Sequence, residues 1–288
     1  ISFAPYVDMT GDHQPLTSIV RRTGQRDFVL GFVLARHGRC EPSWGGMLAV
    51  DDARLRAGFR ALHALGARIT VSSGGELGDY LENACSTPAA LAAAYRQALD
   101  AVGADRLDLD IEHAVPAAKV NTALAALQQQ RGTKISYTLP VHSTTQGLER
   151  SALPLLRDAE RRRIHLTVNA MAMNFVHHGR WARAMTDAAQ ASVGQLRRLW
   201  PSATEAQTRH RTGLVAMIGR NDDGIVTTVE DARELVRFAR ASGIGHVGFW
   251  SLGRDAAGCA NLRTPVETCS GIRQRPYEFT TVFRQEAR

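Results

Sequence analysis

Short apolar segments alternate with amphipathic segments along most of the chain. Strands are expected where apolar residues dominate a short run, in Ile1–Asp8, Phe28–Ala35, Ala67–Ser72, Leu107–Glu112, Lys134–Pro140, His165–Asn174, Gly213–Ile218 and His246–Ser251. Helices are expected between them, in Asp51–Leu65, Leu91–Val102, Ala117–Gln130, Arg150–Arg163, Ala184–Leu199 and Val229–Ala241. This alternation predicts an α/β fold, a (β/α)8 TIM barrel forming a single domain over residues 1–288. A doubly wound open sheet is the alternative, which the lack of a Gly-rich phosphate motif after the first strand disfavours.

Local signals mark the ends of two of these helices. Thr87 and Pro88 precede the segment Leu91–Val102, as an N-cap residue and a first-turn proline do, and Gly103 follows it. Thr228 is the expected N-cap of Val229–Ala241. These signals support the helix assignments independently of hydrophobic spacing.

One predicted strand alternates strictly between acidic and aliphatic residues. Successive strand side chains point to opposite faces, so Asp108, Asp110 and Glu112 share one face and the aliphatic residues between them share the other. Like charges about 6–7 Å apart along a strand shift each other's pKa. One carboxyl can then stay protonated beside an ionised neighbour near neutral pH. Catalytic groups of barrels lie at strand C-termini, so the pattern predicts acid catalysis on a sugar bond, with Glu112 outermost.

Composition and charge exclude several function classes. With 44% hydrophobic residues the chain can form a large core, and no apolar run approaches the roughly 20 residues that span a membrane. The net charge is +7, but the basic residues are scattered and nearly all arginine, with Lys119 and Lys134 as the two lysines. We therefore expect no nucleic-acid and no membrane partner. No interface stripe is apparent, so a monomer is expected.

Four cysteines indicate an oxidising compartment. None forms a C-x-x-C pair, which disfavours a zinc or redox motif. Cys259 and Cys269 flank a loop-like segment and could form a local disulfide, which leaves Cys40 with Cys85; four unpaired thiols are the alternative. The chain begins at Ile1 without a signal-like segment. We expect a secreted protein whose leader is absent from this sequence.

The motif Asp105-x-x-Asp108-x-Asp110-x-Glu112 resembles the signature of family 18 glycoside hydrolases, the chitinases and related endo-β-N-acetylglucosaminidases. Arg106 replaces the glycine usual after the first Asp. Further similar segments occur in chain order: Ser72-Ser73-Gly74-Gly75, Met171-Ala172-Met173-Asn174-Phe175, Met217–Asp222, Phe249–Asp255 and Cys269–Ile272. Together they span nearly the whole chain, as in bacterial members with a single catalytic domain.

The resemblance implies a chitinase that cleaves β-1,4 bonds between N-acetylglucosamine units with retention, by substrate-assisted catalysis. It implies that Glu112 is the general acid and base, that Asp110 orients the substrate acetamido group, and that Asp108 tunes Asp110. Asp105, Ser72, Gly74 and Gly75 would be structural. No cofactor and no metal are expected, although three inward carboxylates could also bind a cation. The expected partners are chitin or N-acetylglucosamine oligosaccharides.

The remaining implied contacts line the sugar site. Trp250 would form the apolar floor under the sugar, and Met217 would line the pocket wall or the core. Asn174 stands where the family usually has Asp, and Met173 where many relatives have the Tyr that bonds the acetamido oxygen. Tyr6 and Tyr137 are the candidate replacements for that tyrosine.

The stretch after the seventh predicted strand bears on the type of cleavage. A short stretch follows the seventh strand, without room for the extra α+β insertion of some chitinases, which favours internal cleavage. The alternatives are an endo-β-N-acetylglucosaminidase acting on N-glycans, a transglycosylase, and a non-catalytic chitin-binding, lectin-like barrel. The retained Asp108, Asp110 and Glu112 argue against the lectin.

Overall fold

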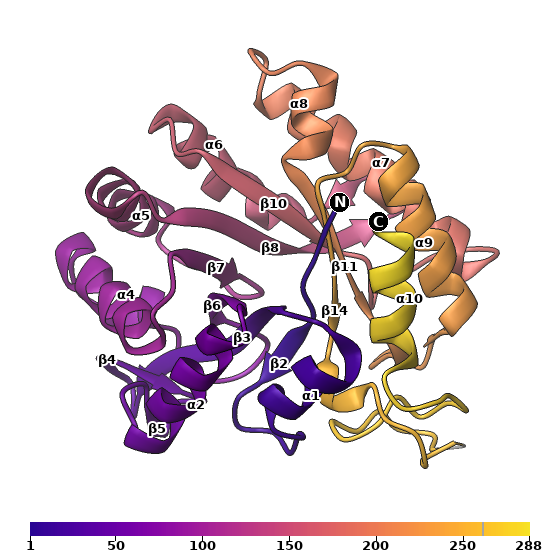
Figure 1. Ribbon diagram of the computed structural model, residues 1–288. Coiled ribbons are helices and arrows are strands. Elements are labelled where there is room, and N and C mark those ends of the chain that lie inside the picture. Colours follow the sequence, from indigo (N-terminus) through magenta and orange to yellow (C-terminus); the bar gives the residue numbers. More distant parts are fainter. Residues whose placement is uncertain (261) are drawn as a thin grey trace. The chain divides into compact units, whose positions relative to one another are not determined.

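A computed structural model describes residues 1–260 and 262–288 (Figure 1). The chain forms two compact units that are interleaved along the sequence. The first unit comprises Ile1–Gln25, Leu139–Arg150 and Val168–Arg288, and the second comprises Arg26–Thr138 and Ser151–Thr167. Each unit has parallel strands with helices packed on them.

The parallel strands of the second unit carry the acidic motif. They are β3 (Asp27–Arg36), β6 (Arg68–Gly74), β7 (Arg106–Asp110) and the first half of β8 (Lys134–Ser143), hydrogen-bonded in that order. A hairpin of β4 (Arg39–Trp44) and β5 (Leu48–Ala49) continues antiparallel from β3. The register sets Asp108 opposite Ser72 and Ser136, and Asp110 opposite Gly74 and Thr138. The neighbours of the two aspartates are therefore small or hydroxyl-bearing residues.

Some helices of the second unit begin at a residue whose side chain caps the helix. The helices of this unit are α2 (Ala53–Ala64), α3 (Leu81–Ala84), α4 (Pro88–Val102), α5 (Ala117–Arg131) and α6 (Leu153–Arg161). The Thr87 hydroxyl accepts the Ala90 N–H at 3.1 Å, and Gly103 ends α4 in the left-handed conformation. One face of α4, including Leu91, Tyr95 and Leu99, is buried. This face packs on α5, β6 and β7 (Figure 1), so the sheet is shielded from water on that side.

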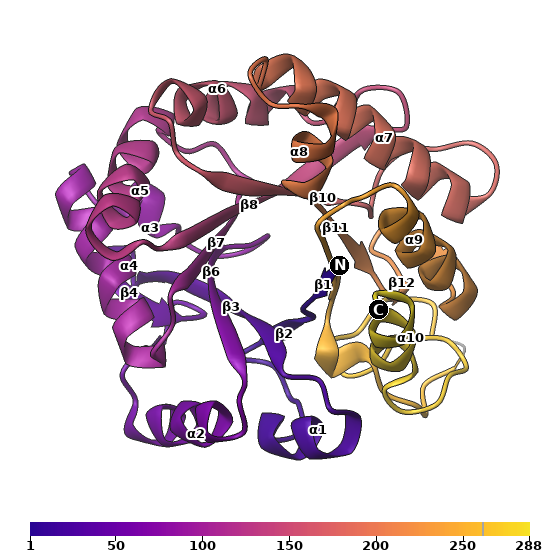
Figure 2. The same cartoon turned by 45° about the horizontal axis from the view of Figure 1, so that its top comes forward.

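The first unit is built around a second run of parallel strands. These are β10 (Leu166–Met171), β11 (Thr212–Met217), β14 (His246–Trp250) and β1 (Ser2–Phe3), hydrogen-bonded in that order. Short strands accompany them: β2 (Tyr6–Asp8), β9 (Gly147–Leu148), β12 (Gly219–Arg220) and β13 (Val226–Thr227). The helices are α1 (Leu16–Thr23), α7 (Trp181–Leu199), α8 (Glu205–His210), α9 (Val229–Ala241) and α10 (Glu278–Glu286). Helix α9 packs on α7, α10 and β14 (Figure 2).

The predicted elements are present, with some errors at their ends. The segment Val229–Ala241 is a helix with the predicted bounds, and Thr228 and Asp231 form a capping box at its start. The prediction that Glu112 belongs to a strand is wrong, because β7 ends at Asp110. The hairpin β4–β5 and the helices α1, α8 and α10 were not predicted. These elements are short, and short segments give weak periodic signals.

Both predicted disulfides are present. Cys40 of β4 is bonded to Cys85, directly after α3, and Cys259 is bonded to Cys269. The first bridge joins two parts of the second unit, 45 residues apart in sequence, and the second closes a loop of the first unit across a separation of 10. Within residues 1–260 and 262–288, none of the helices has both the length and the apolar character needed to cross a bilayer.

Candidate active site

Asp108 lies at the centre of a hydroxyl cluster on one face of the second unit's sheet. Asp108 is 1% exposed, and its carboxyl accepts hydrogen bonds from Ser72 Oγ at 2.8 Å, from Ser136 Oγ at 2.5 Å and from Thr138 Oγ1 at 2.9 Å. All three contacts use the carboxyl as an acceptor, which is what an ionised carboxylate offers. The structural role predicted for Ser72 is thus a direct hydrogen bond that orients Asp108.

Asp110 has a quite different environment on the same strand face. It is buried, and in the described part of the chain its Oδ1 has no hydrogen-bond partner. Burial raises the pKa of Asp110 well above its usual value, and the nearby charges of Glu112 and Asp108 raise it further. A buried carboxyl oxygen without a hydrogen-bond partner lowers the stability of the folded protein unless a ligand donates a hydrogen bond to it. Asp110 therefore offers a buried oxygen with which a polar ligand could form a hydrogen bond.

Glu112 lies just beyond the end of β7, where the backbone no longer pairs with a strand on both sides. The Ile111 N–H still donates to the Thr138 carbonyl at 3.0 Å, but the Glu112 N–H donates to Tyr80 Oη at 3.1 Å. The Glu112 side chain is exposed. The β ladder ends here because β6 also ends, at Gly74, so Glu112 has no strand neighbour on that side.

The Gly74-Gly75 turn at the end of β6 accommodates this arrangement. A Cβ on Gly74 would lie 2.0 Å from the Asp110 carbonyl oxygen, and the φ of Gly74 is +106°. The Gly75 N–H donates to the same oxygen at 2.9 Å. A side chain at position 74 would collide with the backbone of Asp110, so this turn requires glycine there.

The prediction that Tyr137 binds substrate is wrong. Tyr137 is fully buried, pairs with Leu109 in the strand register, and donates its hydroxyl to Asn121 Oδ1 of α5 at 2.6 Å. It therefore lies on the helix-facing side of β8, opposite to Ser136 and Thr138. Asp105 lies at the other end of the motif, where Lys134 forms an ion pair with it at 3.1 Å, consistent with a structural role.

The predicted sugar platform, Trp250, belongs to the first unit. It ends β14, pairs with Met217 of β11 and is partly exposed, whereas Met217 is buried. The ring of Tyr6 lies 6.2 Å from the Trp250 ring. Glu267 accepts a hydrogen bond from the Trp250 side chain, and burial raises the pKa of Glu267. The structure thus brings Tyr6, Trp250 and Met217 together within one unit.

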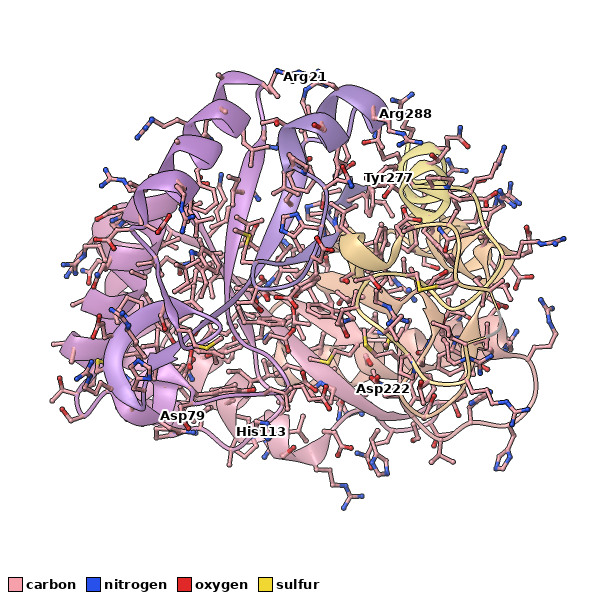
Figure 3. All side chains as sticks on the ribbon, turned by 90° about the horizontal axis from the view of Figure 1, so that it is seen from below. Arg21, Asp79, His113, Asp222, Tyr277 and Arg288 are labelled. Atoms are coloured by element: carbon pink, nitrogen blue, oxygen red, sulfur yellow. A yellow bond between two sulfur atoms is a disulfide. The ribbon has the colours of Figure 1, made fainter. Side chains whose placement is uncertain are left out.

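Asn174 lies three residues beyond the end of β10, with a φ of +52°. Its amide is engaged at both ends by Asp222 (labelled in Figure 3): Nδ2 donates to Asp222 Oδ2 at 2.8 Å and Oδ1 accepts from the Asp222 N–H at 3.1 Å. Asn174 is exposed and Met173 is half-buried. The pair fixes the loop after β10 to the loop after β12.

Sequence reasoning missed several residues of these clusters. Ser136 and Thr138 could have been found, because they lie two residues apart on the predicted fifth strand and so share one face. Tyr80 and Glu267 carried no such signal, since both come from irregular segments. Within the described residues, no group of three or more His, Cys, Asp and Glu side chains could hold a metal ion.

Comparisons with known proteins place this geometry in a family. The crystal structure of the catalytic domain of a hyperthermophilic chitinase from Pyrococcus furiosus is 30% identical, covers 99% of this chain and 94% of that one, and matches with a TM-score of 0.89. A probable bifunctional chitinase/lysozyme of Escherichia coli K12 is 28% identical over 98% of this chain and 34% of that protein. Endochitinase 11 of Metarhizium anisopliae is 28% identical over 88% of this chain and 52% of that protein. No protein-family model matches the chain.

The chain belongs to the family 18 glycoside hydrolases and corresponds to a chitinase catalytic domain. The predicted fold class, a (β/α)8 TIM barrel, is confirmed by the same likeness. The chain spans about a third and about half of the length of the two curated relatives.

Proposed function

We propose that this protein hydrolyses β-1,4 bonds between N-acetylglucosamine units of chitin and its oligosaccharides. The observation that carries the proposal is the pair Asp108–Asp110 on one strand face. Asp108 accepts hydrogen bonds from three hydroxyl groups, while a buried oxygen of Asp110 has no partner among the described residues. Such an oxygen suits the N–H of a substrate acetamido group. The likeness to a Pyrococcus furiosus chitinase, of which catalytic-site mutants have been crystallised with chito-oligosaccharides, supports the substrate class.

In the proposed mechanism the substrate supplies the nucleophile. The acetamido oxygen attacks the anomeric carbon as the glycosidic bond breaks, and Glu112 gives its proton to the leaving oxygen. The product is an oxazolinium ion on the sugar. Glu112, now ionised, removes a proton from a water molecule that attacks the same carbon and reopens the ring, so the configuration is retained. The exposed position of Glu112 is compatible with access to both the leaving group and water.

Asp110 and Asp108 would control charge during the first step. The carboxyl of Asp110 accepts the acetamido N–H and holds the group in the orientation needed for attack. As positive charge develops on the nitrogen, the proton retained by Asp110 can be shared with Asp108. The charges of Glu112 and Asp108 raise the pKa of Asp110, so the protonation of Asp110 depends on theirs. The hydroxyls of Ser72, Ser136 and Thr138 would keep Asp108 in place throughout.

The residues of the first unit would hold the sugar. Trp250 would pack against the C–H groups of the sugar ring, with Met217 and Tyr6 completing its surroundings. Tyr6 is the remaining candidate for contact with the acetamido oxygen, while Asn174 and Met173 would border the site. We further propose that the chain acts as one secreted, monomeric catalytic domain without a cofactor, and that it cleaves internally.

The test is hydrolysis of chito-oligosaccharides by the wild-type protein, by Glu112→Gln and by a control, Glu230→Gln, which changes an exposed residue of α9. Wild type and control should release shorter oligomers whose lengths, read by mass spectrometry, report internal cleavage. Glu112→Gln should lose about 10²–10⁴-fold in kcat, the usual contribution of general acid–base catalysis, while still binding the oligomer. Binding without cleavage by the wild type would indicate a lectin-like protein, and cleavage only of N-glycans would indicate the other substrate class.

A further inference from the structure

Tyr80 places one hydroxyl group at the junction of two strand ends. Tyr80 is 3% exposed and lies immediately before α3. Its hydroxyl donates to the Gly75 carbonyl at 2.5 Å, approaches the Asp110 carbonyl at 3.3 Å, and accepts the Glu112 N–H at 3.1 Å. One hydroxyl therefore contacts the turn after β6 and the backbone on both sides of Ile111.

The hydroxyl replaces a strand partner that the sheet no longer provides. On the β8 side, the Ile111 N–H is satisfied by Thr138. On the β6 side, the chain turns away at Gly74 and Gly75, so no β6 carbonyl remains for the Glu112 N–H. Tyr80 takes this position. Burial raises the pKa of Tyr80, so its hydroxyl keeps the proton that it donates to Gly75.

The same loop also holds the residue after Glu112. The His113 ring lies 5.5 Å from the Tyr80 ring, and its Nε2 is 2.6 Å from the Glu76 carbonyl oxygen. Asp79, from this loop, and His113 are found at the same edge of the second unit in Figure 3. Contacts from residues 75–80 thus hold the backbone at Asp110 and Glu112 and the side chain of His113.

We propose that Tyr80 is a positioning residue, which fixes the backbone of Glu112 and thereby aims its carboxyl for proton transfer. The inference rests on the proposed role of Glu112. The Glu112 carboxyl is carried by this backbone, so a shift of the backbone moves the carboxyl with it. Proton transfer requires heavy atoms about 2.6–3.2 Å apart, and a misplacement of about 1 Å can cost 10²-fold in rate.

The test is Tyr80→Phe, which removes the hydroxyl and keeps the ring. The matched control is Tyr95→Phe on α4, because Tyr95 is also buried and donates its hydroxyl to a buried carboxyl group, that of Glu82, at 2.5 Å. In Tyr80→Phe, kcat on chito-oligosaccharides should fall about 10- to 100-fold with KM changed less than about threefold. In Tyr95→Phe, kcat should stay within about threefold of wild type. Hydrogen exchange at the Glu112 amide should accelerate only in Tyr80→Phe.

Three results would overturn the inference. The first is a folded Tyr80→Phe protein with wild-type kcat; the second is an unchanged exchange rate of the Glu112 amide. The third is an equal loss of kcat in both variants that follows their loss of thermal stability. Glu112→Gln on the same substrates separates this inference from the proposed function: an active Glu112→Gln protein removes both. An inactive Glu112→Gln with a fully active Tyr80→Phe removes only the role of Tyr80.

Discussion

Glu82 is a fully buried carboxyl group that should make folding stability depend on pH. Its Oε1 accepts hydrogen bonds from Ser73 Oγ at 2.8 Å and from Tyr95 Oη at 2.5 Å, while Oε2 is without a partner in the described part of the chain. Burial raises the pKa of Glu82 above its ordinary value of 4.5, and outweighs the opposing effect of these hydrogen bonds. The folded protein therefore keeps a proton that the unfolded chain releases.

The sign and size of the effect follow from proton linkage. Above a pH of about 4.5 the unfolded chain ionises at this residue while the folded chain does not, so the free energy of unfolding falls as pH rises towards the folded-state pKa. Each pH unit within this window lowers it by about 1.4 kcal/mol. Glu82→Gln keeps the side-chain shape and the Oε1 acceptor but cannot ionise, so this pH dependence disappears. The amide of Gln adds an unpaired donor, which costs about 1–3 kcal/mol at every pH.

The assay is urea unfolding of wild type, Glu82→Gln and the surface control Glu230→Gln between about pH 4 and pH 8, a range that brackets the ordinary glutamate pKa. The free energy of unfolding of Glu82→Gln relative to wild type should rise by up to about 1.4 kcal/mol per pH unit above pH 4.5. Asp110 and Asp255, whose pKa values burial also raises, are present in all three proteins and cancel in the comparison. Parallel curves for wild type and Glu82→Gln would refute the reasoning.

Two further predictions concern stability. Replacing Cys40 and Cys85 by Ala should lower the free energy of unfolding by about 4 kcal/mol, and removing the Cys259–Cys269 bridge should lower it by about 3 kcal/mol, because stabilisation by a disulfide grows with the length of the loop that it closes. Urea unfolding measures both losses. A larger loss for the Cys259–Cys269 bridge would contradict this account. Gly74→Ala should destabilise the protein and reduce kcat, because its Cβ would lie 2.0 Å from the Asp110 carbonyl oxygen. Gly58 lies in α2, and a Cβ there would have nothing within 4 Å, so Gly58→Ala should stabilise the folded protein by about 0.5–1 kcal/mol. Thermal unfolding measures both glycine variants. Equal shifts of the unfolding temperature in the two variants would contradict the argument from local backbone conformation.

The acidic face could be predicted because strand alternation is a local property of the chain. Asp108 and Asp110 lie on one face, as their spacing requires, and the raised pKa of Asp110 follows the expected direction. The same rule would have corrected the prediction for Tyr137, since its position between Ser136 and Thr138 sets it on the opposite face. That error came from choosing a tyrosine by type and not by its place in the alternation.

The sequence by itself determined the order of the main strands and helices, the helix caps at Thr87 and Thr228, and the strand face that carries Asp108 and Asp110, because these depend on neighbours within a few residues. Only the tertiary structure decided the contacts between distant segments. The hydrogen bond from the Glu112 N–H to Tyr80 joins residues 32 apart, and the amide pairing of Asn174 with Asp222 joins residues 48 apart. Such contacts depend on where each strand ends and how the following turn is shaped, and strand periodicity carries no information about either.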